Sequence, residues 1–524
     1  MRLNFLPVAS ALTLGTVLSG CYTYQPPPAA TEGLTFSKRV NQEGDEALRK
    51  LDVLTLDDAI KIAVINNPSY ISAYHAVNAA RMRYYQAWGA YSPTITSSFS
   101  IGQTQTNRNN LVNSNGTNSN TTNTSTGVTA SWVVFDGLAR DMEILAAEHS
   151  FDYQSQLRDD VRRKLILAVA YAYDEILLAV ENKRIAVADM EFQQKNLKET
   201  QLKYQAGAVP LSDVLNFQIK VNDATSNQIS ADYQYEIALY ALAVLMGYPE
   251  GTLPANIKFP AIDTTIQDTL TSVEVYLDTA LHNRPDLAAY REQLEIAKYN
   301  MYRSYSSFSP VASVHASFGY DTALTKYPGP QSAGTFSSES YNHTYGETGR
   351  FDYGGSVEWT VFNGLQRYNT MREAQAQVAA AEFTVTENWL NVVNEVRGAY
   401  ANYVQNVKQA KLYEMTLGLV VKQRDLVEEE YRAGNTELTR LNEAQLNLVE
   451  AETQLVSALV NVLKAQANLD SVTNTNFVGV DDQSKFMTLA AAKEEANAGE
   501  SQILAPNTAV SQPAAAPGKT DATK

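Results

Sequence analysis

Two hydrophobic periods alternate along this chain. After residue 434, apolar side chains recur at every seventh position, which predicts a helix with a coiled-coil seam. The members of this seam are Leu441, Leu448, Leu455, Val462 and Leu469. Residues 95–101 instead alternate apolar with small polar side chains, the pattern of a strand with one apolar face. The chain is therefore expected to combine long helices with amphipathic strands.

Two segments of equal length predict exceptionally long helices. The segments 138–206 and 365–433 contain no proline and few glycines. At about 1.5 Å per residue, each helix would extend about 100 Å. Gly207 and Gly434 follow directly and stand where a helix is expected to stop.

A heptapeptide occurs twice, just before these helices. It reads VFDGLAR at 134–140 and VFNGLQR at 361–367. Aspartate and asparagine are preferred helix N-caps, and glycine permits a sharp turn. We therefore expect a strand to end and a helix to begin at both copies. The residues assigned to these two turns are Asp136, Gly137, Asn363 and Gly364.

The heptapeptides belong to a longer internal repeat. Pro68 and Pro285 are 217 positions apart, as are Pro93 and Pro310, whereas the heptapeptides are 227 apart. The sequence thus predicts a duplicated helix-strand-strand-helix unit. The expected divisions are a signal peptide (1–20), an N-terminal extension (21–50), a first repeat (51–247), a linker (248–273), a second repeat (274–472) and a disordered C-terminal segment (473–524).

The alternating segments indicate how the chain would cross a membrane. Each repeat contains two alternating segments of about ten residues, enough for a tilted strand to cross a bilayer. Long polar segments, 107–126 and 321–350, join the strands of each pair and are expected to be loops. Four strands leave two open edges, and unpaired backbone groups are costly in hydrocarbon. Several copies are therefore expected to close one barrel of 8, 12 or 16 strands.

Charge and cysteine content narrow the class of protein. The net charge of −16 argues against a nucleic-acid partner. The one cysteine, Cys21, follows Leu18-Ser19-Gly20 and an apolar run, and this stretch resembles a lipobox. Cys21 is expected to carry a covalent lipid and to become the mature N-terminus. No uninterrupted apolar run past this point is long enough to predict a membrane-spanning helix.

No motif predicts catalysis. The five histidines show no metal-ligand spacing, and the sequence contains no glycine-rich phosphate loop and no nucleophile elbow. We therefore expect no enzyme activity, no metal site and no cofactor apart from the lipid.

Taken together, the lipobox, the paired prolines, the Phe-Asx-Gly turns and the paired Tyr-x-Ala-Gly segments resemble the TolC-type outer-membrane efflux factors over roughly residues 52–472. This resemblance implies an α+β membrane protein: a homotrimer with a 12-stranded β-barrel in the outer membrane of a Gram-negative bacterium. The barrel would continue into a periplasmic α-helical coiled-coil tunnel. A periplasmic adaptor and an inner-membrane transporter would deliver substrates to it.

The resemblance also assigns roles at the helix ends. Gly207 and Gly434 correspond to hairpin turns that meet the adaptor, and Leu211 and Leu438 would pack beneath these turns. At the closed entrance the family commonly has acidic residues just past the second turn. Only Glu443 fits this pattern.

Arg440 occupies the other acidic position, and Asp213 is its equivalent in the first repeat. An Asp213–Arg440 pair between hairpins is therefore one hypothesis for a periplasmic gate. The alternative is that Asp213, Arg440 and Glu443 are solvated helix residues.

Two other functions remain open on the sequence alone. One is a duct dedicated to protein or polysaccharide secretion. The other is a surface adhesion protein that conducts nothing. The sequence identifies neither the substrate nor the particular pump.

Overall fold

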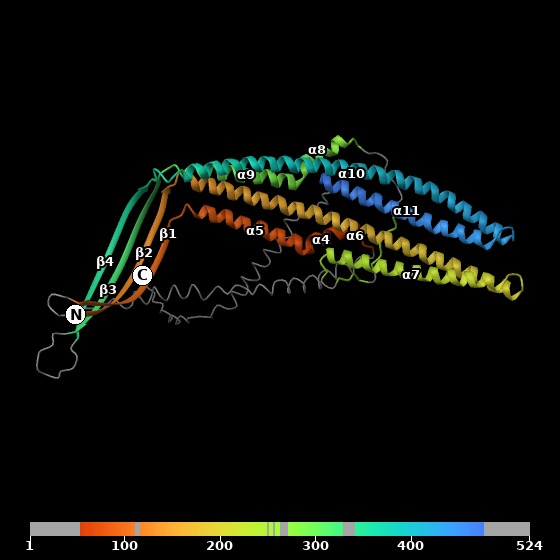
Figure 1. The fold of residues 1–524 in the computed structure, drawn as a ribbon, viewed down its shortest axis with the longest axis horizontal. Coiled ribbons are helices and arrows are strands. Elements are labelled where there is room, and N and C mark those ends of the chain that lie inside the picture. Colours follow the sequence, from red (N-terminus) through yellow and green to blue (C-terminus); the bar gives the residue numbers. More distant parts are fainter. Residues whose placement is uncertain are drawn as a thin grey trace, which may run out of the picture. The chain divides into compact units, whose positions relative to one another are not determined.

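Helices account for most of the chain described by this computed structural model (Figure 1). The described residues are 53–109, 116–248, 251–254, 257–262, 271–328 and 341–475. The first half contains α4 (Leu56–Asn66), α5 (Pro68–Gly89), β1 (Thr94–Asn109), β2 (Gly116–Phe135), α6 (Ala139–Gln205) and α7 (Leu211–Leu245). The second half contains α8 (Val273–Asn283), α9 (Pro285–Ser306), β3 (Val311–Pro328), β4 (Tyr341–Glu358), α10 (Gln366–Arg432) and α11 (Leu438–Thr473). The same order of elements thus occurs twice.

The two longest helices match the sequence prediction closely. Both α6 and α10 have 67 residues, and each begins and ends one residue inside the predicted limits. In Figure 1, α5, α6, α9 and α10 lie side by side, and packing contacts join them in that order. The described chain contains no helix with the length and apolar character needed to cross a membrane.

The four strands form one antiparallel sheet in the order β1-β2-β3-β4. They have 16, 20, 18 and 18 residues, so the prediction of about ten was wrong. The polar segments predicted as loops supply the extra pairs, because threonine favours strands and the backbone can pair regardless of side-chain polarity. β4 ends at Glu358, because its partner β3 begins opposite that residue, at Val311.

The sheet has one apolar face and one polar face. Residues opposite each other on paired strands share a face, and the register places the large apolar side chains together. This apolar face consists of Ile95, Phe99, Ile101, Val128, Trp132, Val314, Phe318, Phe351 and Tyr353, all exposed in the isolated chain. The opposite face includes Thr96, Thr129, Ser317 and Asp352, which are aligned across the sheet. The alternation read from the sequence therefore predicted the faces correctly.

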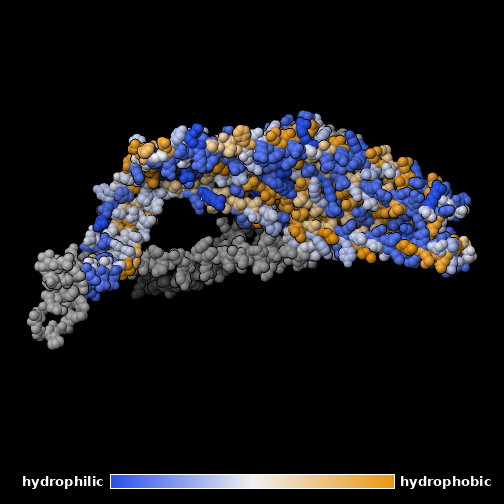
Figure 2. Space-filling model, in the orientation of Figure 1, coloured by the Kyte–Doolittle hydropathy of each residue, from blue (hydrophilic) through white to orange (hydrophobic). Residues whose placement is uncertain are grey.

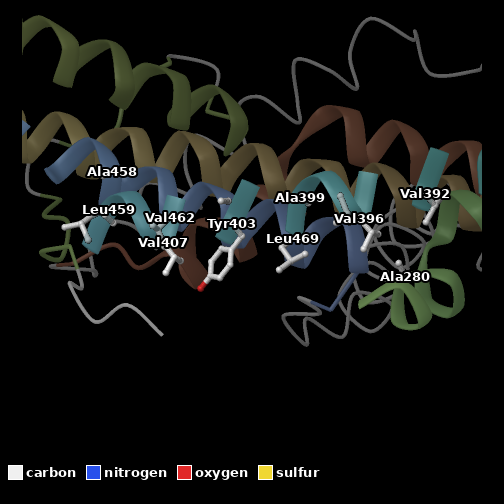
Figure 3. Close-up of a cluster of buried hydrophobic side chains, with 13 residues drawn as sticks. Ala280, Val392, Val396, Ala399, Tyr403, Val407, Ala458, Leu459, Val462 and Leu469 are labelled. Carbon is white, nitrogen blue, oxygen red and sulfur yellow. The ribbon is translucent and has the colours of Figure 1, made fainter. Parts of the chain in front are cut away.

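The core of the second half lies between α10, α11 and α8. Figure 3 shows this core, in which side chains from α10 and α11 meet along the helices. Of the seam residues predicted on α11, Val462 and Leu469 lie in this core and Leu455 packs against it. Leu441 is buried in a second cluster with Val427 and Ala444, and Leu448 is buried as well. On α7, the sequence analysis missed a second buried series at seven-residue spacing, formed by Phe217, Ala224, Ala231 and Ala238. Three of its four members are alanine, which gives a weak hydrophobic signal.

A buried ionic network fastens α9 to its neighbours. The Arg284 guanidinium contacts the carboxylates of Asp286 and of Glu395 on α10, each at 2.5 Å. Arg163 on α6 contacts Asp160 at 2.6 Å and donates to the Ser471 carbonyl on α11 at 3.3 Å. Burial favours a higher pKa for Asp286, but the hydrogen bonds and charge of Arg284 outweigh it and hold the pKa below its usual value. The Asp286 contribution to stability is therefore lost only as pH falls through that lowered pKa.

Asp174, near the middle of α6, has the opposite effect. Its side chain is 4% exposed. Burial raises its pKa to about 7; the nearby Lys464 ammonium opposes the shift and the Glu175 carboxylate adds to it. Between the unfolded pKa of about 3.9 and this value, the folded state binds more protons than the unfolded state. This group therefore lowers stability progressively as pH rises through that window.

We predict that Asp174→Asn raises the unfolding temperature at pH 8 and leaves it nearly unchanged at pH 4. The amide stays neutral at both pH values, so it removes a penalty that exists only when Asp174 is charged in the folded state. Circular dichroism melts of both proteins across this pH range measure the effect. Glu191→Gln, at an exposed carboxylate elsewhere on α6, is the control. Equal shifts at pH 4 and pH 8 would contradict the assignment.

Candidate functional site

Each strand-to-helix turn contains two consecutive residues in the left-handed region. Gly137 and Leu138 have φ of 69° and 68°, and Gly364 and Leu365 have φ of 68° and 65°. A leucine rarely adopts this conformation. Its occurrence at both equivalent positions shows that the turn geometry is a shared feature of the repeats.

The predicted caps, Asp136 and Asn363, lie two residues too early. Leu138 and Leu365 occupy the N-cap positions, and neither makes a side-chain cap hydrogen bond. The two left-handed residues place Asp136 and Asn363 further upstream. Their side chains still satisfy the first helical turn. Asp136 accepts from the Arg140 N–H at 3.2 Å, and Asn363 accepts from the equivalent Arg367 N–H at 3.5 Å.

The arginine that ends each heptapeptide stabilises the turn, a role that was not predicted from the sequence. The Arg140 guanidinium donates to the carbonyls of Ala90 at 3.3 Å, Val133 at 2.7 Å and Val134 at 3.2 Å. The Arg367 guanidinium donates to the carbonyls of Ser307 and Val361, both at 2.9 Å. Ser307 and Val361 are the repeat equivalents of Ala90 and Val134. Each guanidinium therefore joins the end of one helix, the end of a strand and the start of the next helix.

Aromatic residues complete both turns. Arg140 stacks on the Tyr91 ring at 4.8 Å, and Arg367 on the Phe308 ring at 5.3 Å. Trp132 and Trp359 donate their Nε1–H groups to the carbonyls of those same two aromatic residues, at 2.9 Å and 3.2 Å. The repeated final arginine of the heptapeptide was the available signal for this arrangement.

The helical hairpins turn at the predicted glycines. Gly207 and Gly434 have φ of 76° and 77°, and the following N–H groups donate back to the carbonyls of Lys203 and Glu430, both at 2.9 Å. This is the hydrogen-bond pattern that ends a helix at a left-handed residue.

The leucines just past these turns differ in environment. Leu211 and Leu438 are the first residues of α7 and α11. Leu211 is 50% exposed, so the expectation that it packs beneath its turn is wrong for the isolated chain, and Leu438 is half-buried. Each hairpin end consists of only two helices, so few neighbours are available to cover these side chains.

The three predicted gate residues do not form one cluster within the chain. Arg440 lies 3.5 Å from Glu430 of the same hairpin, and both are exposed. Asp213 accepts a hydrogen bond from the Ser212 hydroxyl at 3.4 Å. Glu443 lines a cavity of about 530 Å³ between α6, α7 and α11. An Asp213–Arg440 contact thus requires a second copy or a different arrangement of the hairpins.

A polar contact that the sequence analysis missed joins the two hairpins. The amide of Gln445 on α11 donates to the Asp189 carboxylate on α6 at 3.0 Å. The Gln193 amide donates to the same oxygen at 3.3 Å. Gln193 and Gln445 are buried, and Asp189 is partly buried at the cavity lined by Glu443. No motif signals it, because its members are 256 positions apart.

A family model described as outer membrane efflux protein matches the chain twice, over residues 59–248 and 276–475. The chain belongs to this family. The matched segments contain the four strands and six of the eight helices of the described chain, and all of α4 and α8 except their first three residues. The resemblance to TolC-type efflux factors stated from the sequence is therefore confirmed.

Individual relatives agree with the family. The chain is 24% identical over 327 residues to the alkaline protease secretion protein AprF of Pseudomonas aeruginosa, covering 62% of this chain and 61% of that protein. It is 22% identical over 406 residues to the outer membrane protein TolC of Escherichia coli, covering 77% of each. Its fold is similar to that of the CmeC outer membrane channel of Campylobacter jejuni, with a TM-score of 0.66 at 17% identity, covering 83% of this chain and 88% of that one.

For this efflux family member, the comparisons support a location in the outer membrane and a role as an efflux or secretion channel. The relatives are channel and secretion proteins rather than enzymes. Cys21, the predicted lipid attachment site, lies outside the described residues.

We predict that Arg140→Ala and Arg367→Ala each destabilise the strand-to-helix turn. Each substitution removes several hydrogen bonds of about 0.5–1.5 kcal/mol, so the expected loss is about 1–3 kcal/mol. Thermal unfolding followed by circular dichroism measures it. Arg372→Ala is the control, because the exposed Arg372 guanidinium donates to Gln375 on its own helix at 3.0 Å and takes no part in the turn. A change no larger than that of the control would contradict the role of the two arginines.

Proposed function

We propose that three copies of this chain form a duct through the outer membrane, with a 12-stranded barrel continuing into a helical coiled-coil tunnel in the periplasm. The observation that carries the proposal is the amphipathic sheet with two open edges, β1 and β4. In hydrocarbon, each unpaired backbone group at these edges costs several kcal/mol. Pairing β4 of one copy with β1 of the next satisfies both edges.

The unequal surroundings of equivalent helices support assembly of identical copies. By repeat position, α5 corresponds to α9, and α6 to α10. Among these four helices of the described chain, α6 packs between α5 and α9, whereas α10 packs against α9 alone. The vacant side of α10 is therefore a place for α5 of the next copy.

Equivalent side chains show the same imbalance. Ile185 on α6 is 3% exposed, whereas Leu412, its equivalent on α10, is 58% exposed. Val460 on α11 is fully buried, whereas Tyr233, its equivalent on α7, is 63% exposed. In the chain, α11 packs against α6, but α7 and α10 make no comparable packing. Packing of α7 on α10 of a second copy would bury both exposed members. Apolar patches remain visible among polar residues on the helices in Figure 2.

The strand-to-helix turns are a third observation that supports assembly of identical copies. A Cβ on Gly137 would lie 2.5 Å from the Ser309 Cβ, so glycine is required by a close neighbour. A Cβ on the equivalent Gly364 meets nothing within 4 Å. The repeat equivalent of Ser309 is Ser92, which would fill this space from the next copy.

In this duct, substrates would pass without chemistry. An inner-membrane transporter would supply the energy, and a periplasmic adaptor would engage the turns at Gly207 and Gly434 together with Leu211 and Leu438. A lipid on Cys21 would add an anchor in the outer membrane. A narrower candidate, protein secretion, is favoured by the similarity to a protein named for alkaline protease secretion.

We predict that the purified protein produces discrete conductance steps in planar lipid bilayers and a trimer mass by native mass spectrometry in detergent. A non-conducting adhesion protein would give no steps. Tyr233→Asp should abolish both trimer and conductance, because it places a charge in the proposed contact between α7 and α10. Gln234→Asp is the control, because it adds the same charge at the next position of α7, which is also exposed. A conducting Tyr233→Asp monomer would overturn the assembly.

The gate yields a separate prediction. If Asp213 of one hairpin pairs with Arg440 of another, Arg440→Ala and Asp213→Asn should both raise the conductance. Loss of an exposed pair worth about 0.5–1 kcal/mol in each of three copies shifts the closed-to-open ratio about tenfold or more. Glu430→Gln removes only the contact within the hairpin and should leave conductance unchanged. If Arg440→Ala changes neither conductance nor drug sensitivity, Arg440 has no part in a gate.

A further inference from the structure

We propose that His149, Asp152 and Glu292 bind one zinc ion in each chain. His149 and Asp152 lie on α6, and Glu292 lies on the neighbouring α9. One potential ligand atom from each residue lies within 4.8 Å of the other two. All three side chains are partly buried.

The donor set suits zinc. Zinc is commonly bound by imidazole nitrogen and carboxylate oxygen in a tetrahedral arrangement, with water completing a three-residue site. His149 and Asp152 are three positions apart, which places them on one face of α6. A histidine and a carboxylate at this spacing, facing a carboxylate on another helix, is a known way to build a metal site in a helical bundle.

The geometry lies close to that of a bound ion. The His149 Nδ1 and a Glu292 carboxylate oxygen are 2.7 Å apart, joined by a hydrogen bond. Around zinc, with ligand distances of about 2.0–2.2 Å, ligand atoms are about 3.3–3.6 Å apart. Zinc would therefore replace the shared proton, with a small separation of these two groups and a small approach of Asp152.

The histidine ring is held in place from its other side. Tyr299, also on α9, stacks on it with a centroid distance of 5.2 Å and an interplanar angle of 18°. A ring fixed in this way loses little rotamer freedom when it binds a metal. The bound ion would join α6 to α9 a few turns from the strand-to-helix junction.

The site occurs in one repeat only. The positions equivalent to His149 and Asp152 in α10 are Ala376 and Ala379, and the position equivalent to Glu292 in α5 is His75. The ligand set is therefore not a feature of the repeated scaffold. It belongs to the packing of α6 on α9 within a single chain, so zinc binding does not depend on trimer formation or conduction.

Competition with a chromophoric zinc chelator, on the full-length protein purified in detergent and stripped of metal, tests the proposal. We expect one zinc per chain in the wild type and no zinc binding by His149→Ala. Asp152→Asn and Glu292→Gln should bind about tenfold more weakly or worse, since changes outside the ligand shell alone cost about 10–100-fold. His75→Ala is the matched control and should bind like the wild type.

A second measurement separates lost ligands from lost folding. Zinc should raise the unfolding temperature of the wild type and of His75→Ala, but not that of His149→Ala. The Asp152→Asn and Glu292→Gln variants keep side-chain size and should show wild-type circular dichroism without zinc. The proposal is overturned if the wild type binds no zinc, or if His149→Ala retains stoichiometric binding.

Discussion

The need to pair every backbone N–H and C=O group inside a membrane governs this structure. A helix satisfies these groups within itself, but a sheet does so only if it closes. The described chain has no helix suited to the bilayer and one sheet with two free edges. In the proposed duct, further copies of the same chain would close those edges, and the helices that follow the strands would pack between copies.

Duplication makes this closure geometrically simple. Each half supplies two strands and one 67-residue helix, joined by a turn whose arginine makes equivalent contacts in both halves. In the proposed assembly, because the halves are alike, the contact between halves within a chain would serve as a model for the contact between chains. The exposed Leu412 and Tyr233 and the open space at Gly364 would then lie at the contact between copies.

The sequence predicted what periodicity controls. The limits of α6 and α10, the seam along α11 and the two faces of the sheet follow from local spacing, and the structure confirms them. The strands were predicted too short because the side chains of their outer parts are polar, whereas their pairing depends on the backbone. The alanine series on α7 has too little hydrophobic contrast to be recognised.

Contacts between residues far apart in the sequence could not be predicted from the sequence. The contact between Asp189 and Gln445 and the group of His149 with Glu292 join residues 256 and 143 positions apart. Helix packing, not spacing in the sequence, brings them together. Among the gate residues, Arg440 contacts Glu430 of its own hairpin within the chain, and its pairing with Asp213 of another hairpin stays a prediction.

The two glycine turns differ in one respect that bears on biogenesis. Beside Gly137 the space is occupied by Ser309 of the same chain, whereas the space beside Gly364 is open in the single chain and, in the proposed assembly, would be filled only when another subunit arrives. In an assembling duct, half of the corners would thus remain unfinished on every newly made subunit. Such unfinished corners would distinguish an orphan subunit from a mature complex and give periplasmic proteases a local target in the former.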